Sequence, residues 1–101
     1  MQSISEEEAR NRLQERGHSN VVKLTLPPNQ AKATHSHPYH ADVIVMQGNI
    51  KIVTDCREYN LRPGDEFQLD SGIMHTEETG GKGVVILAAV AKEATPTKNR
   101  S

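Results

Sequence analysis

From Val21 onward, apolar and polar side chains alternate with a period of two, which is typical of β-strands. Gly, Pro, Asn and Asp residues interrupt the pattern at short intervals and predict turns. The segments predicted as strands are 21–26, 30–36, 43–46, 50–53, 58–61, 67–69, 75–78 and 83–92. Gly48-Asn49, between two β-branched runs, predicts a hairpin turn at 47–49. About eight short strands at this spacing predict an all-β sandwich or barrel.

The first residues follow a different pattern. Ser5 and Glu8 form a capping box, and Gly17 can end a helix, so the sequence predicts a short N-terminal helix over 5–17. Its apolar residues at helical spacing are few, chiefly Ala9 and Leu13. We expect a surface helix laid against a barrel or a partner, not a core element.

Length and composition limit the classes of protein to which this chain can belong. With 101 residues, the chain is expected to form one domain over 1–101, with the barrel at 21–92 and a disordered tail at 93–101. A net charge of −1 without a basic cluster argues against nucleic-acid binding. The N-terminus has no apolar leader, and the longest apolar run, 84–91, is too short to span a membrane. A single cysteine fits a reducing compartment, so the expected location is cytoplasmic.

Three histidines carry the candidate chemistry. His35 and His37 are two residues apart in an extended segment, so their side chains point to the same face. A Pro-Gly-Asp turn, a short strand and a Gly turn precede His75, which can bring a third imidazole back from a distant strand. Imidazoles gathered in this way suit a shared metal ion.

Two motifs around these histidines resemble those of the cupin superfamily. HSHPYHADVIVMQG, residues 35–48, resembles the first motif, and GDEFQLDSGIMH, residues 64–75, matches the second at both glycines and the histidine. The resemblance implies a cupin-type double-stranded β-helix, or jelly-roll barrel, with a metal held by His35, His37 and His75. In the second motif Asp70 replaces the usual Pro. In the first, Ala41 stands where the family's acidic ligand is expected.

The sequence therefore does not determine which residue is the fourth ligand. We favour His40, which a local bulge could turn inward; otherwise it is a histidine at the rim of the cavity. Asp42 is a weaker candidate because strand alternation places it opposite Ala41 and Val43. The remaining possibility is a three-histidine site completed by water. Glu77, two residues after His75, is either a partner of the site or a solvated carboxylate at the strand end.

These ligands suit one divalent transition metal ion, Fe, Ni, Zn, Cu or Mn, better than a hard ion such as Mg²⁺. Together with the resemblance, they predict a metal-dependent enzyme of dioxygenase, isomerase or lyase type acting on a small organic substrate. The alternative is a non-catalytic module that binds a metal or a small ligand, such as a sensor. A carboxylate substrate would need an inward cation, for which the nearest candidates are Lys51, Arg57 and Arg62.

The remaining expectations concern the surface. The residues of 43–46 are all apolar, so this strand needs cover on both faces. In so small a protein a second subunit can supply that cover, and we predict a homodimer. His18, in a polar stretch, is expected to be exposed.

Overall fold

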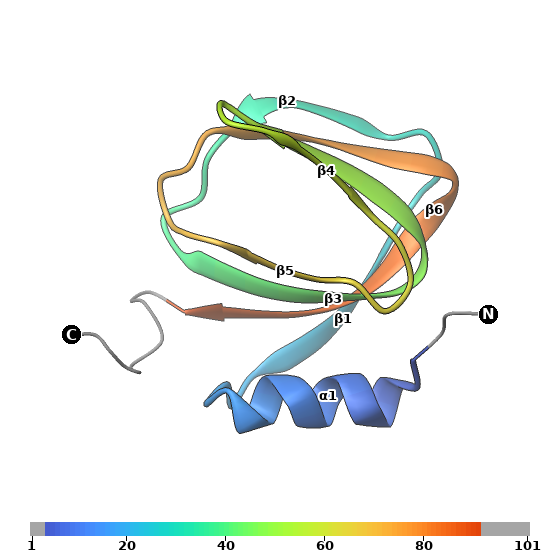
Figure 1. Cartoon of the computed structure of the whole chain (residues 1–101), viewed down its shortest axis with the longest axis vertical. Coiled ribbons are helices and arrows are strands. Elements are labelled where there is room, and N and C mark those ends of the chain that lie inside the picture. Colours follow the sequence, from blue (N-terminus) through green and yellow to red (C-terminus); the bar gives the residue numbers. More distant parts are fainter. Residues whose placement is uncertain (1–3, 92–101) are drawn as a thin grey trace.

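The computed structural model describes residues 4–91, which form one helix and six strands (Figure 1). The elements are α1 (Glu6–Glu15), β1 (Val21–Leu26), β2 (Ala31–His35), β3 (His40–Thr54), β4 (Glu58–Leu61), β5 (Glu66–Leu69) and β6 (His75–Ala91). Within this range, no helix combines the length and the apolar character needed to cross a membrane.

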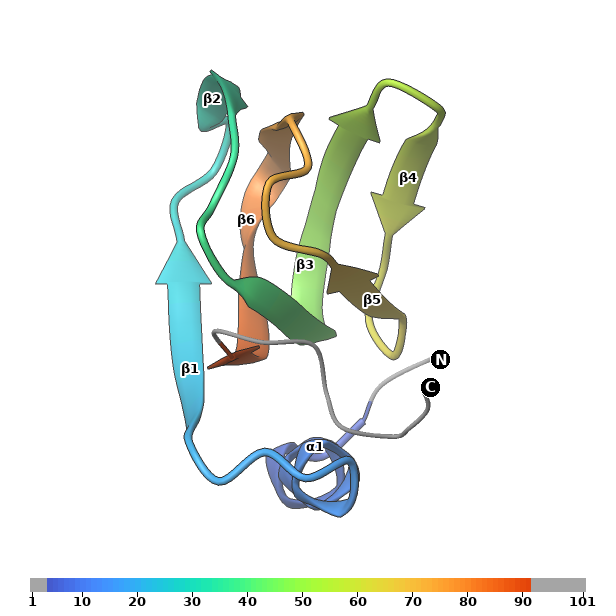
Figure 2. The ribbon, with the colours of Figure 1, turned by 90° about the vertical axis from the view of Figure 1, so that its left-hand side faces the viewer.

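All strand pairs are antiparallel, and the sheet has the order β1-β6-β3-β4, with β2 also paired to β6 and β5 to β3. The first half of β3 pairs with β5 and with the last part of β6, whereas its second half pairs with β4 and the first part of β6. The two long strands therefore pass through both layers of a curled sheet, with α1 beneath one layer (Figures 1 and 2). The predicted all-β class with a short N-terminal helix is confirmed.

The predicted hairpin at 47–49 is wrong, because β3 runs through these residues without turning back. Its pairing with β6 shifts register on both sides of Gly48, which has φ 72° and pairs with Val84. The backbone of Gly48 also lies close to that of Gly83, which has φ 73°. These left-handed glycines form a bulged bend that carries both strands from one layer to the other. In the same way, Gly80-Gly81 lies inside β6 and does not separate two strands.

The core has two parts. The larger part lies between the layers and contains mainly aliphatic side chains together with Phe67. The second part joins α1 to the sheet: Ala9 and Leu13 are 0% exposed and pack in one cluster with Ile44, Met46 and Leu87. The expectation that this helix is not a core element is therefore wrong. Two apolar side chains are enough to make this helix part of the core, because both are fully buried against the sheet.

The helix also covers the face of β3 that was expected to need a second subunit. Ile44 and Met46 project toward α1, while Val45 belongs to the core between the layers. The second apolar face of β3 is thus covered by the chain itself, and a partner subunit is not needed for that purpose. The homodimer stays a prediction, as does the single domain over 1–101. The predicted tail, 93–101, lies outside the described residues.

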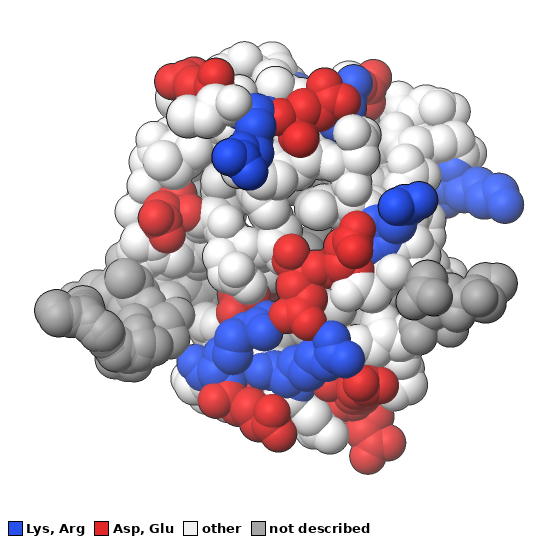
Figure 3. All heavy atoms as spheres, viewed as in Figure 1, with Lys and Arg blue, Asp and Glu red and all other residues white. Residues whose placement is uncertain are grey.

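An ionic cluster fixes the end of α1 to the sheet. The Asp42 carboxylate, with its side chain 8% exposed, accepts hydrogen bonds from Arg16 Nε and Nη2 at 2.9 Å and from Gln68 Nε2 at 3.0 Å. His18 Nε2 lies 2.9 Å from the same carboxylate, and the His18 side chain is only 8% exposed, so the expectation of an exposed histidine is wrong. Arg16 and Arg12 also pair with Glu66. Figure 3 shows basic side chains along α1 between acidic ones.

Replacing Asp42 with Asn is expected to lower the free energy of unfolding at neutral pH by about 2–3 kcal/mol, because Arg16, His18 and Gln68 lose a buried, ionised acceptor. Burial alone would raise the pKa of Asp42, but the hydrogen bonds from Arg16 and Gln68 outweigh it and hold the pKa below its usual value. Its stabilisation is therefore present above the unfolded-state pKa and is lost as pH falls through the lower folded-state pKa. Urea denaturation at a series of pH values measures the difference between wild type and D42N, which should shrink in acid.

The matched control is D55N, because Asp55 is exposed in the turn between β3 and β4. This variant should unfold within about 0.5 kcal/mol of wild type at every pH. If D42N and D55N behaved alike, the cluster would not stabilise the attachment of α1.

Candidate metal centre

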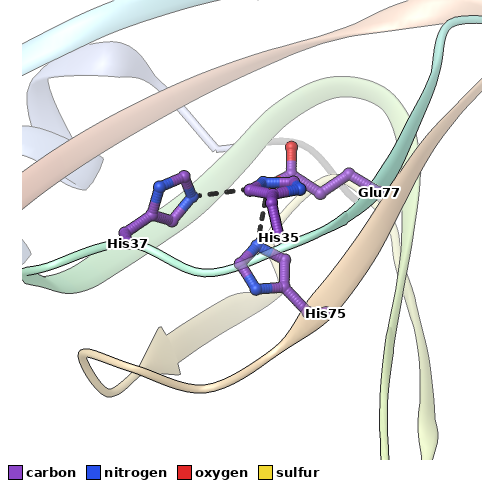
Figure 4. Close-up of side chains that lie close together, drawn as sticks. All are labelled: His35, His37, His75 and Glu77. Atoms are coloured by element: carbon purple, nitrogen blue, oxygen red, sulfur yellow. Dashed lines mark hydrogen bonds and ion pairs between the residues drawn. The ribbon is translucent and has the colours of Figure 1, made fainter.

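Strand pairing brings the three predicted histidines to one place. His35 at the end of β2 is directly opposite His75 at the start of β6. His37 follows two residues after His35, and Glu77 lies two residues after His75, on the same side of β6. Figure 4 shows the four side chains converging from these two segments.

The distances within the group suit a single ion. Glu77 Oε2 lies 2.9 Å from His75 Nε2, 3.3 Å from His35 Nε2 and 3.8 Å from His37 Nε2. One ligand atom from each residue falls within 4.8 Å of the others. Ligands at about 2.0–2.2 Å from a common tetrahedral or octahedral ion are separated by roughly 3–4 Å. The four residues therefore fit a transition metal ion.

Hydrogen bonds orient the imidazoles for this role. His35 Nδ1 lies 2.7 Å from the carbonyl oxygen of Ala33, and His75 Nδ1 lies 2.9 Å from that of Ile73. Because a carbonyl oxygen only accepts, each Nδ1 carries the proton and donates it. In a neutral ring the lone pair is then on Nε2, which faces the centre. His37 Nδ1 contacts the Tyr39 hydroxyl at 3.2 Å, and the two rings stack.

Burial and charge favour the protonation states that a metal requires. Desolvation lowers the pKa of His37, and the neighbouring imidazoles of His35 and His75 lower it further. Burial would raise the pKa of Glu77, but two effects bring it below its usual value: the hydrogen bond that Nε2 of His75 donates when that ring carries both protons, and the positive charge of Lys32. A neutral imidazole and an ionised carboxylate are the ligating forms.

The other proposed fourth ligands lie elsewhere. His40 Nδ1 accepts a hydrogen bond from the Ser71 backbone N–H at 3.2 Å and is 3.5 Å from Asp70 Oδ1. It is not among the four residues of the group within 4–91, and its coordination of a metal stays a prediction. Asp42 is engaged in the ionic cluster beside α1, on the face of β3 that alternation had indicated. The carboxylate that lies in the group is that of Glu77, and the sequence signal for it was its spacing of two residues from His75.

A cavity of about 190 Å³ adjoins the group and lies inside the barrel. Its walls are mainly aliphatic, and its polar side chains are Lys32, His37, Tyr39 and Glu77. The expected inward cations do not line it. Lys51 pairs with Glu78 at 3.3 Å, and the guanidinium of Arg57 lies over the ring of Tyr59.

Comparison with known proteins gives a consistent picture of the fold. A family model described as a cupin domain matches residues 22–90. No curated protein matches the chain. Among solved structures, a conserved Streptococcus pyogenes protein of unknown function is 24% identical, with a TM-score of 0.61 over 72% of this chain and 63% of its own. The cupin domain of Schizosaccharomyces pombe Cnp3 is 13% identical, with a TM-score of 0.64 over 72% of this chain and 52% of that domain.

A structural-genomics protein of unknown function from Rhizobium leguminosarum is 16% identical, with a TM-score of 0.63 over 92% of this chain and 98% of its own. The chain thus spans less than two thirds of the Streptococcus and Schizosaccharomyces structures and nearly all of the Rhizobium one. At these identities the likeness concerns the fold alone.

Proposed function

Since this chain belongs to the cupin family, we propose that it is a metal-dependent enzyme that acts on a small organic molecule bound inside the barrel. The observation that carries the proposal is the convergence of three Nε2 atoms and one carboxylate beside a mainly aliphatic cavity, whose wall includes two members of the group, His37 and Glu77. His75 is fully buried, whereas the side chains of His35 and His37 are 29% and 28% exposed. The centre is therefore open to a ligand on one side, as catalytic sites require.

Each side chain has a defined part in this proposal. His35, His37, His75 and Glu77 would hold one divalent transition metal ion, Fe, Ni, Zn, Cu or Mn, which would supply Lewis acidity or oxygen activation. Tyr39 holds the ring of His37 by stacking and by its hydrogen bond. The aliphatic walls exclude water and orient the substrate beside the centre. We propose a reaction of dioxygenase, isomerase or lyase type in a cytoplasmic protein, with a homodimer as its expected form.

Elemental analysis of untagged protein purified without chelator tests the metal. We expect near one equivalent of a transition metal per chain. Iron would direct the assay to substrate-dependent oxygen uptake, and zinc or nickel to isomerase and lyase substrates. Absence of metal from the purified protein, together with no uptake of added Fe²⁺, Ni²⁺ or Zn²⁺, would end the enzyme proposal and leave the fold unaffected. Ligand binding without turnover in the metal-loaded protein would favour the sensor alternative.

A further inference from the structure

We propose that the barrel cavity selects a small carboxylate, with Lys32 holding its charged end beside the metal centre and the aliphatic walls enclosing its apolar body. The inference rests on the proposed function, because it specifies the substrate class of the same site. Lys32 takes the role that the sequence analysis had given to other cations. None of these lines the cavity: Lys51, Arg57 and Arg62.

The position of Lys32 comes from the sheet. Lys32 on β2 is opposite Glu77 on β6 in the antiparallel register, so both side chains lie on the same face. Both line the cavity, together with His37 and Tyr39. Because His37 also contacts Tyr39 and lies 3.8 Å from Glu77, the polar side chains gather at one part of an otherwise aliphatic wall.

Lys32 also has an available charge. In residues 4–91 it makes no ion pair, whereas Lys23 and Lys51 pair with Glu6 and Glu78, each at 3.3 Å. A cation that lines a cavity without a carboxylate partner within ion-pair distance is suited to bind an anion from solution.

The charge of the whole site favours the same ligand. With neutral imidazoles, a divalent ion and the Glu77 carboxylate leave one net positive charge, and the Lys32 ammonium adds a second. Glu78, the next carboxylate along β6, pairs with Lys51. A site with this net positive charge attracts an anion and disfavours a cation.

The size of the cavity limits the apolar part of the ligand. An apolar cavity of about 150 Å³ holds one benzene molecule, and this one measures about 190 Å³. Its apolar walls come from β1, β3, β4, β5 and β6 and include Leu24, Leu61, Phe67 and Ile86. One ring or a chain of about six carbon atoms fits this volume. Benzoate and hexanoate are therefore suitable probes.

Titration calorimetry of the Zn²⁺-loaded protein tests the inference, since zinc supports no oxygen chemistry. Benzoate or hexanoate should bind at least about 10-fold more tightly than benzamide or hexanamide. K32Q should lose about 10-fold or more in affinity for the carboxylate, with amide affinity and zinc content unchanged, and K32R should restore part of the loss. K82Q is the matched control, because Lys82 is an exposed lysine like Lys32 but does not line the cavity.

Equal affinity for carboxylate and amide, equal carboxylate binding by K32Q and wild type, or no binding of either carboxylate would overturn the inference while zinc remained bound. Failure to bind any of Zn²⁺, Fe²⁺ and Ni²⁺ would instead overturn the proposed function. In that case the same titrations of the metal-free protein show whether Lys32 still selects the carboxylate.

Discussion

H75A is expected to lose transition-metal binding, with an affinity lower than that of wild type by about 100-fold or more. Substitution of a residue that merely orients a ligand costs about 10–100-fold in metal affinity, and removal of a ligand costs at least the upper end of that range. His75 is the most enclosed member of the group and contacts Glu77 Oε2 at 2.9 Å, so no solvent ligand can easily replace it. Competition titration against a chromophoric chelator measures the affinity.

A companion series separates loss of a ligand from loss of folding. H35A and H37A remove partly exposed side chains and leave smaller cavities, yet they should lose metal to a similar extent. E77Q keeps the shape of the side chain and removes its charge, so it should weaken binding. H40A is the comparison variant: if His35, His37, His75 and Glu77 hold the ion, it should bind metal like wild type, whereas loss of metal would make His40 a ligand, as the sequence predicted. The ligand assignment is wrong if H40A loses the metal while E77Q keeps it, provided that circular dichroism shows both variants to be folded.

G48A is expected to lower the free energy of unfolding by about 4 kcal/mol or more, an exceptional loss for one methyl group. Gly48 has φ 72°, which disfavours any residue with a side chain, and an added Cβ would overlap the backbone carbonyl group of Gly83. Neither atom belongs to a flexible side chain, so relief requires the two long strands to separate at their bend. Urea denaturation of the variant measures the loss.

Gly72 provides the control for the backbone conformation alone. Its φ of 80° is similar, but an added Cβ would meet nothing within 4 Å. G72A should therefore cost only about 1–2 kcal/mol, the strain of a left-handed conformation. Equal losses in G48A and G72A would mean that the bend relaxes freely and that close packing of Gly48 on Gly83 contributes nothing.

Local patterns predicted the strands better than they predicted the connections between them. Alternation located β1 and β4 with their observed bounds, because each is a short strand with a regular pattern. The same pattern divided β3 and β6 at their glycines, since Gly-Asn and Gly-Gly are typical both of hairpin turns and of bulges. Only the pairing of Gly48 with Val84, and of its neighbours with β6, distinguishes the two, and pairing is a property of the whole sheet.

In the candidate site, too, the sequence identified some residues and could not identify others. His35, His37 and His75 could be identified because their spacing determines their geometry: two lie two residues apart in one segment, and one follows a Gly turn. The neighbour that joins them, Glu77, shares the two-residue spacing, but nothing local distinguishes it from a solvated carboxylate. His18 and Asp42 meet across 24 positions of sequence, and Lys32 reaches the cavity only through its register with β6. No local pattern reveals such contacts.

The strand β6 pairs with β1, β2 and β3, and its partners include Val21, which meets Ala89. During synthesis the ribosome must therefore release residues 75–91 before the barrel can close, and until then only the pairing of β3 with β4 and β5 is available. Contacts so distant in sequence make closure slow. His35 and His37 meet His75 and Glu77 only at that stage. An ion held by these four residues would therefore not act as a nucleus for the nascent chain and would instead bind a barrel that has already assembled.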